Sequence, residues 1–258
     1  MNIQTLFNHF SQTTEGTWIM QFPNAVDLYN FIKNHPIKKV LSLGTGVGFS
    51  DSVIALAWKD KGIEDGEIDS IEQFDKCIKI ANELIPEELK KYIKIQKQEP
   101  KIWTTDKIAY QYFSVYKELP DKDYDLIIND GPGPFVDEYG SFVEIPNGTI
   151  HKLTLEDKIK PGTFIIYDGR IPSLNLLERY FDSCYYLVNV PKNGSDFFVL
   201  ERKNTPVIIK DVRYEAFLKN TTYFKNEEES KQKNSISSNK QSPSGKTEVT
   251  DKGTTEKV

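Results

Sequence analysis

Three glycines at alternate positions, Gly44, Gly46 and Gly48, are the first candidates for ligand binding. A glycine lets the backbone approach a ligand that any Cβ atom would displace, and a following helix adds oriented N–H donors. The spacing is G-x-G-x-G, because Phe49 stands where the dinucleotide fingerprint G-x-G-x-x-G requires its third glycine. The loop therefore predicts a ligand site and argues against a nicotinamide oxidoreductase, with a tight structural turn as the alternative.

Carboxylates end three of the apolar stretches that follow, at Glu72, Asp130 and Asp168. In doubly wound enzymes, a carboxylate at the end of the second strand accepts hydrogen bonds from ribose hydroxyls. A carboxylate at the mouth of the ligand crevice can align a nucleophile or remove its proton. We expect the first role for Glu72 and the second for Asp130, with Asp168 on the neighbouring strand. A solvated strand end and a turn-capping aspartate are the respective alternatives.

The apolar stretches alternate with longer helical patterns, which is typical of βαβ units and a parallel sheet. We expect an α/β fold with a doubly wound, mostly parallel, seven-stranded sheet that ends in an antiparallel hairpin, with helices on both faces. The expected strands are 39–43, 67–72, 92–96, 124–130, 162–168, 184–190 and 196–201. The expected helices are 50–58, with Ser50 or Asp51 as its N-cap, 74–85 and 174–181.

The composition of the 258 residues predicts one catalytic-size domain over residues 1–225, with its core at 38–201. Residues 226–258 have almost no apolar side chains, so we expect a disordered polar tail, with a partner-docking tail as the alternative. The net charge of −5 gives no clear signal for nucleic acid or an anionic membrane. No apolar run approaches the length of a membrane span, and the simplest expectation is a cytoplasmic enzyme.

Four segments resemble, in order, the motifs of the class I (Rossmann-like) S-adenosylmethionine-dependent methyltransferases. They are 40–49, 70–75, 124–130 and 160–168, and the resemblance covers about residues 38–201. It implies S-adenosylmethionine as the cofactor. The cofactor-binding residues that it implies are Gly44, Thr45, Gly46, Gly48, Glu72, Gln73, Gln98, Glu99 and Asp130. Asp130 and Asp168 are the candidate catalytic residues.

The chain departs from the family pattern at two positions. Ser42 stands two residues before the first glycine, where the family usually has Asp or Glu, and a serine cannot supply that charge. Metal-assisted O-methyltransferases, a looser resemblance, hold a divalent cation with carboxylates at the places of Asp130 and Asp168, followed by Asn. Gly169 removes that last oxygen ligand. A divalent metal is therefore possible but not favoured.

The acceptor of the methyl group is not evident from any motif. The segment 129–132 lacks the consecutive prolines typical of enzymes that methylate amino groups of nucleic-acid bases. We therefore favour O-methyl transfer to a small molecule or a sugar hydroxyl, with specificity set by residues 1–35 and 131–150. A catalytically silent cofactor-binding or scaffold protein is the main alternative, and a polyamine synthase is less favoured. The oligomeric state is open.

Two further features allow more than one interpretation. His151 follows a stretch with Pro146 and Gly148, and we interpret it as a surface histidine that starts a helix, with a mobile general base as the alternative. The aromatic residues between Trp103 and Tyr116 fit packing in a helix core, and some of them are candidates for stacking on adenine or on an aromatic acceptor.

Overall fold

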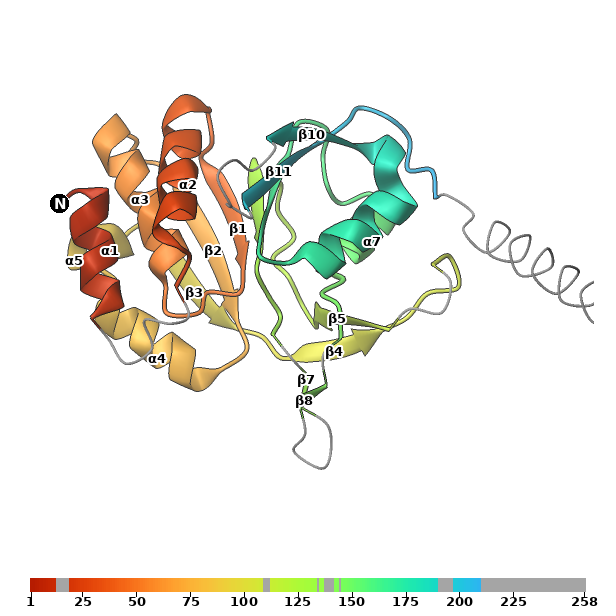
Figure 1. Cartoon of the computed structure of the whole chain (residues 1–258), viewed down its shortest axis with the longest axis horizontal. Coiled ribbons are helices and arrows are strands. Elements are labelled where there is room, and N and C mark those ends of the chain that lie inside the picture. The colour runs from red at the N-terminus through yellow and green to blue at the C-terminus, as the bar shows by residue number, and fades with distance from the viewer. Residues whose placement is uncertain are drawn as a thin grey trace, which may run out of the picture. The chain divides into compact units, whose positions relative to one another are not determined.

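A seven-stranded sheet forms the centre of the chain in a computed structural model that describes residues 1–12, 19–108, 112–133, 135–136, 142–143, 145–189 and 197–209. The strand order is β10-β11-β9-β6-β1-β2-β3 (Figure 1). The strands are β1 (Lys39–Leu43), β2 (Glu67–Glu72), β3 (Ile93–Lys97), β6 (Leu126–Asn129), β9 (Phe164–Asp168), β10 (Tyr185–Asn189) and β11 (Phe197–Arg202). Six strands run in the same direction, and β11 runs antiparallel to them, between β9 and β10. The expected fold class is confirmed, including the closing hairpin.

The register of the sheet places the predicted site residues around one strand. In β1, Leu43 pairs with Ile71 of β2 on one side and with Asn129 of β6 on the other. Because these strands are parallel, their carboxyl ends meet at one edge of the sheet. Glu72 and Asp130 therefore lie on either side of the glycine loop that follows β1.

Two layers of helices cover the sheet (Figure 1). One layer contains α1 (Ile3–Ser11), α2 (Phe22–Asn34), α3 (Phe49–Lys61), α4 (Asp75–Leu84) and the short α5 (Glu87–Lys90). Its apolar side chains form one core with inward residues of the sheet such as Val40, Ile68 and Ile128. The other layer contains α6 (Thr149–Leu155) and α7 (Ile171–Phe181), which is followed by the 3₁₀ turn η2 (Asp182–Cys184).

The start of α3 differs from the expectation that Ser50 or Asp51 is the N-cap. The N-cap is Gly48, whose φ of 84° lies in the left-handed region. A glycine adopts this conformation at little steric cost, so the helix begins two or three residues earlier than expected. Asp51 is consequently inside the first turn of α3, and it is fully buried.

The first two helices were not expected from the sequence. α2 begins with Pro23 in its first turn, after Gln21 as N-cap, and it buries Ala25, Leu28 and Ile32. A proline suits the first turn of a helix because the N–H group that it lacks has no partner there. Residues 13–18, between these helices, lie outside the described residues.

An antiparallel hairpin replaces the helix expected around residues 103–116. Its strands are β4 (Pro100–Trp103) and β5 (Phe113–Tyr116), with Trp103 paired to Phe113. The helical interpretation of these aromatic residues was therefore wrong, since aromatic and β-branched side chains favour strands as well as cores. A second small hairpin, β7 (Phe135–Val136) with β8 (Phe142–Val143), follows β6.

His151 is buried in α6, so the prediction of a surface histidine was wrong. Its ring lies between aromatic residues, with its centroid 4.8 Å from that of Phe113 and 6.1 Å from that of Phe181. Burial lowers the pKa of His151 to about 3, which keeps the imidazole neutral at ordinary pH. Since the side chain does not reach solvent, the alternative of a mobile general base has no support either.

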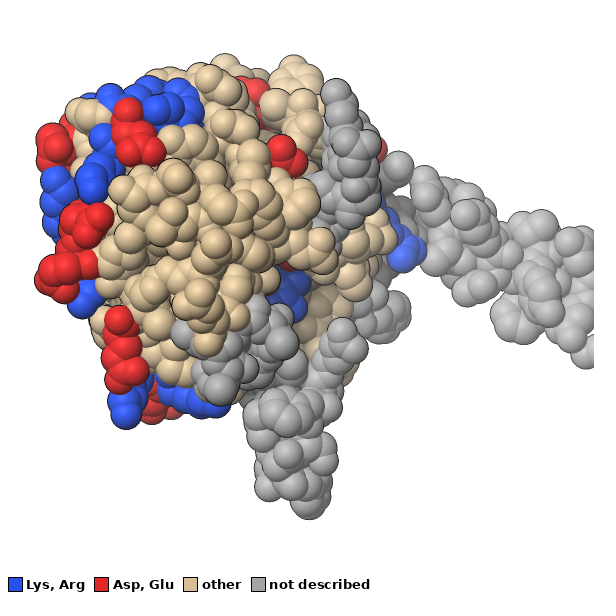
Figure 2. Space-filling model, turned by 60° about the vertical axis from the view of Figure 1, so that its left-hand side comes forward, with Lys and Arg blue, Asp and Glu red and all other residues tan. Residues whose placement is uncertain are grey.

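The surface of the described chain mixes charges of both signs. Figure 2 shows lysine, arginine and acidic side chains interspersed along one edge of the visible face. Several charged side chains of the described chain form exposed ion pairs, such as Lys38 with Asp65 and Lys59 with Glu88. Among the helices described, none has the length and apolar character needed to cross a membrane. The expected tail at 226–258 lies outside the described residues.

Candidate active site

The glycine loop between β1 and α3 uses each glycine for a different reason. Gly44 has a φ of 98°, and a Cβ atom there would lie 2.8 Å from the backbone of both Asp130 and Gly131. Gly44 is therefore required by the close approach of β1 to the end of β6. Gly46, with a φ of 53°, has no atom within 4 Å of its ideal Cβ position. Gly46 thus faces open space at the ligand edge of the sheet.

Thr45 and Gly48 of the same loop point into the protein. Thr45 is 3% exposed, and its hydroxyl lies 2.6 Å from Ser70 Oγ in β2. A Cβ atom at Gly48 would lie 2.8 Å from the side chain of Ile85, after α4. Both residues pack against the protein on the side of the loop that faces away from the crevice. Their prediction as direct cofactor contacts remains untested.

Glu72 is held by the backbone at the end of β2. Its Oε2 accepts a hydrogen bond of 2.8 Å from the Gly46 N–H, and its Oε1 accepts bonds from the N–H groups of Gln73 and Phe74 at 2.7 and 2.9 Å. Burial raises the pKa of Glu72, and the three N–H donors oppose that rise. The carboxylate is thereby fixed in one orientation beside the glycine loop, with lone pairs left for a ligand.

A side-chain ion pair forms the other side of the crevice. Arg170 Nε donates to Asp130 Oδ1 at 3.0 Å, and a second guanidinium nitrogen donates to the Asp130 carbonyl oxygen at 2.5 Å. Asp168, at the end of β9, accepts a hydrogen bond of 2.7 Å from the buried Asn24 of α2. Residues from α2 and from the ends of β6 and β9 thus converge at this edge. The role of residues 1–35 in specificity remains a prediction.

The environment of Asp130 makes this carboxyl group a weaker acid than usual. The surrounding protein raises the pKa of Asp130 to about 7, although 44% of its side-chain surface still meets solvent in the open crevice. The Arg170 guanidinium opposes the rise, while the carboxylates of Asp168 and Glu72 add to it. The charges of Asp168 and Glu72 therefore act on the protonation of Asp130 across the crevice. A pKa of about 7 allows Asp130 to gain or lose a proton near neutral pH.

Glu72, Asp130 and Arg170 line one cavity of about 570 Å³, whereas Asp168 does not contribute to its lining. Four predicted residues contribute to it, namely Gly44, Gly46, Glu72 and Asp130. The other lining residues are Phe74, Lys76 and Cys77 at the start of α4, Tyr116 of β5, Gly131, Gly133 and Arg170. A volume of several hundred cubic ångströms is typical of small-molecule and cofactor sites.

Two lining residues come just after a strand end. Sequence reasoning missed Phe74, whereas it offers Arg170 as a candidate for contact with an anionic substrate, with a solvated surface position as the alternative. Phe74 lies two positions after Glu72, and Arg170 lies two positions after Asp168. The chain turns across the crevice at both places, so a residue two positions after a strand-end carboxylate is a recognisable candidate. Tyr116 had been considered for ring stacking, and it lines the cavity from β5.

Three further residues that the resemblance implies for cofactor binding, Gln98 or Glu99 for its adenine and Gln73, do not contribute to the lining of this cavity. Gln73 Oε1 accepts a hydrogen bond of 2.9 Å from the Gly133 N–H, which connects the end of β2 to the segment after β6. Gln98 donates its backbone N–H to the carbonyl oxygen of Glu72 at 2.8 Å. Glu99 pairs with Lys117 at 2.5 Å, with 65% of its side chain exposed. Adenine contacts of Gln98 and Glu99 remain a prediction.

The donor set at Asp130 and Asp168 does not favour a divalent cation. The guanidinium of Arg170 already places a positive charge on Asp130, and Asn24 donates to Asp168. Among the described residues, no group of three or more histidine, cysteine, aspartate or glutamate side chains is arranged to hold a metal ion. Arg170 thus acts as the cation of this carboxylate cluster.

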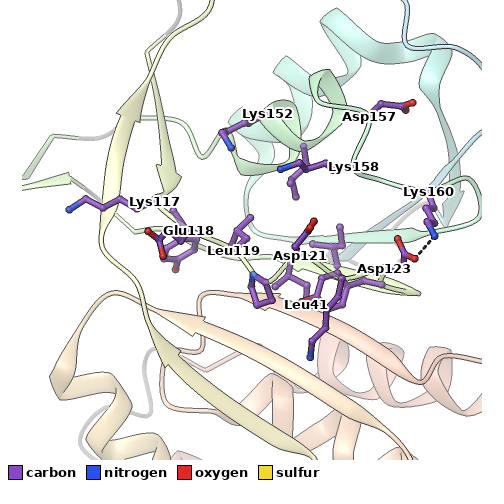
Figure 3. Close-up of a pocket in the computed structure, with 16 residues that line it drawn as sticks. Leu41, Lys117, Glu118, Leu119, Asp121, Asp123, Lys152, Asp157, Lys158 and Lys160 are labelled. Atoms are coloured by element: carbon purple, nitrogen blue, oxygen red, sulfur yellow. Dashed lines mark hydrogen bonds and ion pairs between the residues drawn. The ribbon is translucent and has the colours of Figure 1, made fainter.

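A larger cavity of about 890 Å³ lies over the middle of the sheet, beside Leu41 and Ile127 (Figure 3). Its rim carries lysines and acids that neutralise one another, including Lys160 with Asp123 and Lys152 with the nearby Glu156. The glycine loop and the strand-end carboxylates do not contribute to its lining. Size alone therefore does not identify the candidate active site, and we assign that site to the smaller cavity.

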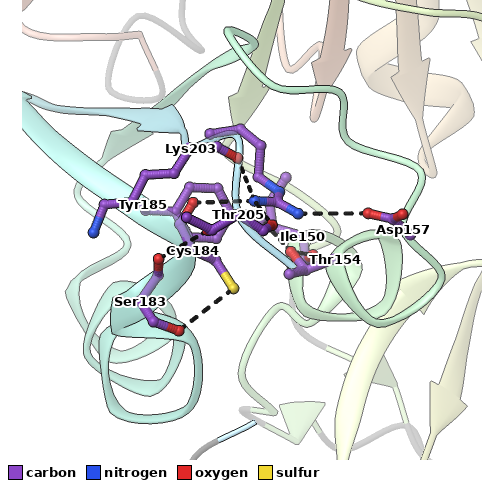
Figure 4. Close-up of polar contacts among 9 residues, drawn as sticks. Ile150, Thr154, Asp157, Ser183, Cys184, Tyr185, Lys203 and Thr205 are labelled. Carbon is purple, nitrogen blue, oxygen red and sulfur yellow. Dashed lines mark hydrogen bonds and ion pairs between the residues drawn. The ribbon is translucent and has the colours of Figure 1, made fainter. Parts of the chain in front are cut away.

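The buried Arg202 contacts Asp157, which lines this larger cavity. Figure 4 shows the polar contacts around Asp157, Lys203 and Thr205. The Arg202 guanidinium donates to the carbonyl oxygens of Lys203 and Thr205 at 2.5 and 3.1 Å, and it lies 3.4 Å from Asp157 Oδ1 on the cavity wall. Arg202 is 3% exposed. It connects the end of β11 to the segment after α6, which is a structural role.

No protein-family model matches the chain, and no curated protein matches it. Solved structures do resemble it. A protein from Klebsiella pneumoniae assigned as an O-methyltransferase is 16% identical, with 79% of this chain and 90% of that chain aligned and a TM-score of 0.53. The Podospora anserina methyltransferase PaMTH1, with bound SAH, is 16% identical over 78% and 88% of the two chains, with a TM-score of 0.49.

The strand order agrees with this similarity. A parallel sheet with one antiparallel strand inserted beside its last member surrounds the glycine loop, and the ligand edge carries the strand-end acids. The first similarity supports the fold and does not by itself assign an activity. Together with the topology, it shows that the chain has the fold of the class I S-adenosylmethionine-dependent methyltransferases.

Proposed function

We propose that this protein is an S-adenosylmethionine-dependent methyltransferase that methylates a hydroxyl group of a small molecule or sugar. One observation carries the proposal: Gly46, Glu72 and Asp130 line the same cavity at the carboxyl ends of parallel strands. The similar Klebsiella pneumoniae protein is described as an O-methyltransferase, which agrees with the proposal. That description belongs to the relative, and the support for this chain comes from its own cavity.

The cavity fits the cofactor in shape and in charge. The open space at Gly46 admits a ligand against the backbone, and the fixed carboxylate of Glu72 can accept ribose hydroxyl groups. Of the two acids that line the cavity, Asp130 is paired with Arg170, and the carboxylate of Glu72 provides the negative charge toward a positively charged ligand such as a sulfonium. When bound, the cofactor supplies an electrophilic methyl group on that sulfonium.

The acceptor chemistry is assigned to the side of the crevice formed by Asp130 and Arg170. Asp130 would accept the proton of an acceptor hydroxyl group. The sulfonium would supply the methyl group for the new C–O bond and would keep the electron pair of the broken C–S bond, leaving S-adenosylhomocysteine. Arg170 holds the carboxylate toward the crevice through its hydrogen bond to Oδ1. Asn24 and Asp168 lie beside this pair and contribute to positioning the acceptor.

A catalytically silent cofactor-binding protein is a second candidate, which the Arg170 ion pair favours. A general base must be free to accept a proton, and Asp130 is already paired on one oxygen. This partly exposed pair is held weakly, however, because exposed ion pairs contribute at most about 1 kcal/mol. We therefore expect the pair to rearrange when an acceptor enters.

Two measurements test the proposal in sequence. Calorimetric titration with S-adenosylhomocysteine measures cofactor binding, and absence of binding by the wild-type protein would overturn the assignment. Methyl-labelled cofactor is then incubated with fractionated cell extract and the labelled product identified. Binding without transfer to any fraction would favour the silent protein, while a labelled amine or nucleic acid would contradict O-methylation of a small molecule.

A further inference from the structure

A second buried carboxylate lies behind the glycine loop, where the proposed mechanism does not use it. Asp51, in the first turn of α3, is 0% exposed. Its position near the N-terminus of a helix favours a negative charge. Burial raises the pKa of Asp51 to about 6, the hydroxyl of Ser70 opposes that rise, and the carboxylate of Glu72 adds to it. A buried carboxylate without a cation destabilises a fold unless hydrogen bonds compensate, so its retention calls for a specific contact.

That contact leads to the ligand loop through two hydroxyl groups. Ser70 Oγ donates to Asp51 Oδ2 at 2.5 Å, and Thr45 Oγ1 lies 2.6 Å from Ser70 Oγ. A serine hydroxyl has one hydrogen. Because Ser70 gives that hydrogen to the carboxylate, Thr45 must donate to Ser70. The ionised carboxylate therefore fixes the direction of the chain of hydrogen bonds and the orientation of Thr45.

Thr45 lies between the two glycines that line the candidate active site. Glu72 holds the next residue, Gly46, from the opposite side by accepting its N–H. The loop is consequently fixed by two carboxylates, one through its backbone and one through a side chain. Hydrogen bonds in such a buried chain strengthen one another in a medium of low dielectric constant.

Ser42 belongs to the same buried cluster. It pairs in register with Ser70 across β1 and β2, so the two side chains stand on the same face of the sheet. The Ser42 hydroxyl faces the Asp51 carboxylate but makes no hydrogen bond of normal geometry among the described residues, and Asp51 Oδ1 is likewise unpaired there. Because position 42 is paired with Ser70, a carboxylate moved from position 51 to position 42 would stay beside the same serine.

We infer that Asp51 is a positioning residue for cofactor binding, which orients the glycine loop through Ser70 and Thr45. In this interpretation, Asp51 of α3 supplies the negative charge that an Asp or Glu of β1 supplies in the family pattern, at the position where this chain has Ser42. This inference rests on the proposed function, because the loop is taken to contact S-adenosylmethionine. It assigns Asp51 no contact with the reacting atoms.

The test is a set of S-adenosylhomocysteine titrations with melting curves as a control for folding. Asp51→Ser should weaken binding about tenfold, the effect of losing one charge-assisted hydrogen bond. Thr45→Val and Ser70→Ala should each weaken binding to a similar extent. Combining Asp51→Ser with Ser70→Ala should add little further loss, since the residues act as one chain. The variant Ser42→Asp with Asp51→Ser should regain most of the affinity.

The outcomes separate the two proposals. Wild-type protein that does not bind S-adenosylhomocysteine overturns the proposed function. Wild-type binding together with unchanged affinity in Asp51→Ser and Ser70→Ala overturns the positioning role alone. Lower melting temperatures with unchanged affinity would also reject it, since they indicate a purely structural residue. If Asp51→Ser does not fold, Thr45→Val and Ser70→Ala decide the question.

Discussion

The two sides of the candidate active site are built by different means. The cofactor half, defined by Gly44, Gly46 and Glu72, is held by backbone hydrogen bonds, and Glu72 is only 4% exposed. The acceptor half, defined by Asp130, Asp168 and Arg170, is held by side chains, of which Asp130 and Arg170 are 44% and 38% exposed. Backbone contacts leave little freedom, whereas exposed ion pairs exchange easily. A rigid site suits a cofactor that is the same in every reaction cycle. A site that rearranges easily suits an acceptor that has to enter and leave beside it.

The largest expected effect is a loss of stability, and it separates a glycine needed for folding, Gly44, from a glycine needed for ligand binding, Gly46. Gly44→Ala should lower the free energy of unfolding by about 3 kcal/mol or more, because strain at positive φ combines with overpacking against Asp130. Gly46→Ala should cost only about 1 kcal/mol, since its Cβ meets no protein atom. It should nevertheless weaken binding of S-adenosylhomocysteine. Denaturant titration and calorimetry check both, and equal stabilities would contradict the assignment.

The next effect concerns turnover in the acceptor half. Asp130→Asn should preserve cofactor binding and lower the rate by about 10²- to 10⁴-fold, as for a lost general base. The raised pKa of Asp130, at about 7, predicts that wild-type kcat/KM increases as the pH rises through 7, because the deprotonated form is the base. The variant should lose this step. Full turnover by Asp130→Asn on an identified substrate would show that the residue caps a turn instead.

Replacement of Glu72 should change the affinity for the cofactor rather than the rate of turnover. Glu72→Ala removes the acceptor of the ribose hydroxyls and leaves the Gly46 N–H without its partner, so affinity for S-adenosylhomocysteine should fall at least about tenfold. Calorimetry with Glu67→Ala as a matched control measures this loss, because Glu67 begins the same strand at an exposed position. A comparable loss in the control would attribute the effect to the strand.

The smallest expected effect is a shift of a pH profile. Arg170 lowers the pKa of Asp130, so Arg170→Ala should move the midpoint of the pH profile upward. The stability should change by no more than about 1 kcal/mol, because the pair is partly exposed. Steady-state rates from pH 6 to 9 provide the measurement. Restoration of the original profile by Mg²⁺ would indicate that a cation site replaces the guanidinium, contrary to our reading of this cluster.

The cofactor half could be predicted from the sequence because its parts are local. An apolar stretch ends directly at Glu72, and the glycines stand immediately after a strand. The same local signal predicts the two strand-end acids of the acceptor half, Asp130 and Asp168, but not the partners of their side chains. The acceptor half depends on contacts between distant segments. Asn24 reaches Asp168 across 144 positions, and Arg170 reaches back to β6 across 40 positions. Periodicity carries no information about such pairs.

The same reasoning explains the errors outside the active site. Aromatic residues suit both a strand and a helix core, so Trp103 and Phe113 did not reveal the hairpin. His151 seemed exposed because histidine is polar and follows a segment that contains Pro146 and Gly148. Its burial depends on Phe113, far away in the sequence. Side-chain exposure is a tertiary property and has no local signature here.

The burial of His151 makes the domain sensitive to acid. An unfolded chain binds a proton at this residue below a pKa of about 6.5, whereas the folded chain resists it down to about 3. Stability supplied by the neutral imidazole is therefore complete above pH 6.5 and is lost as the pH falls toward 3, which amounts to about 2 kcal/mol at pH 5. Denaturation curves at pH 7 and pH 5 should differ by this amount more in the wild type than in His151→Leu. Equal differences would place the acid sensitivity elsewhere.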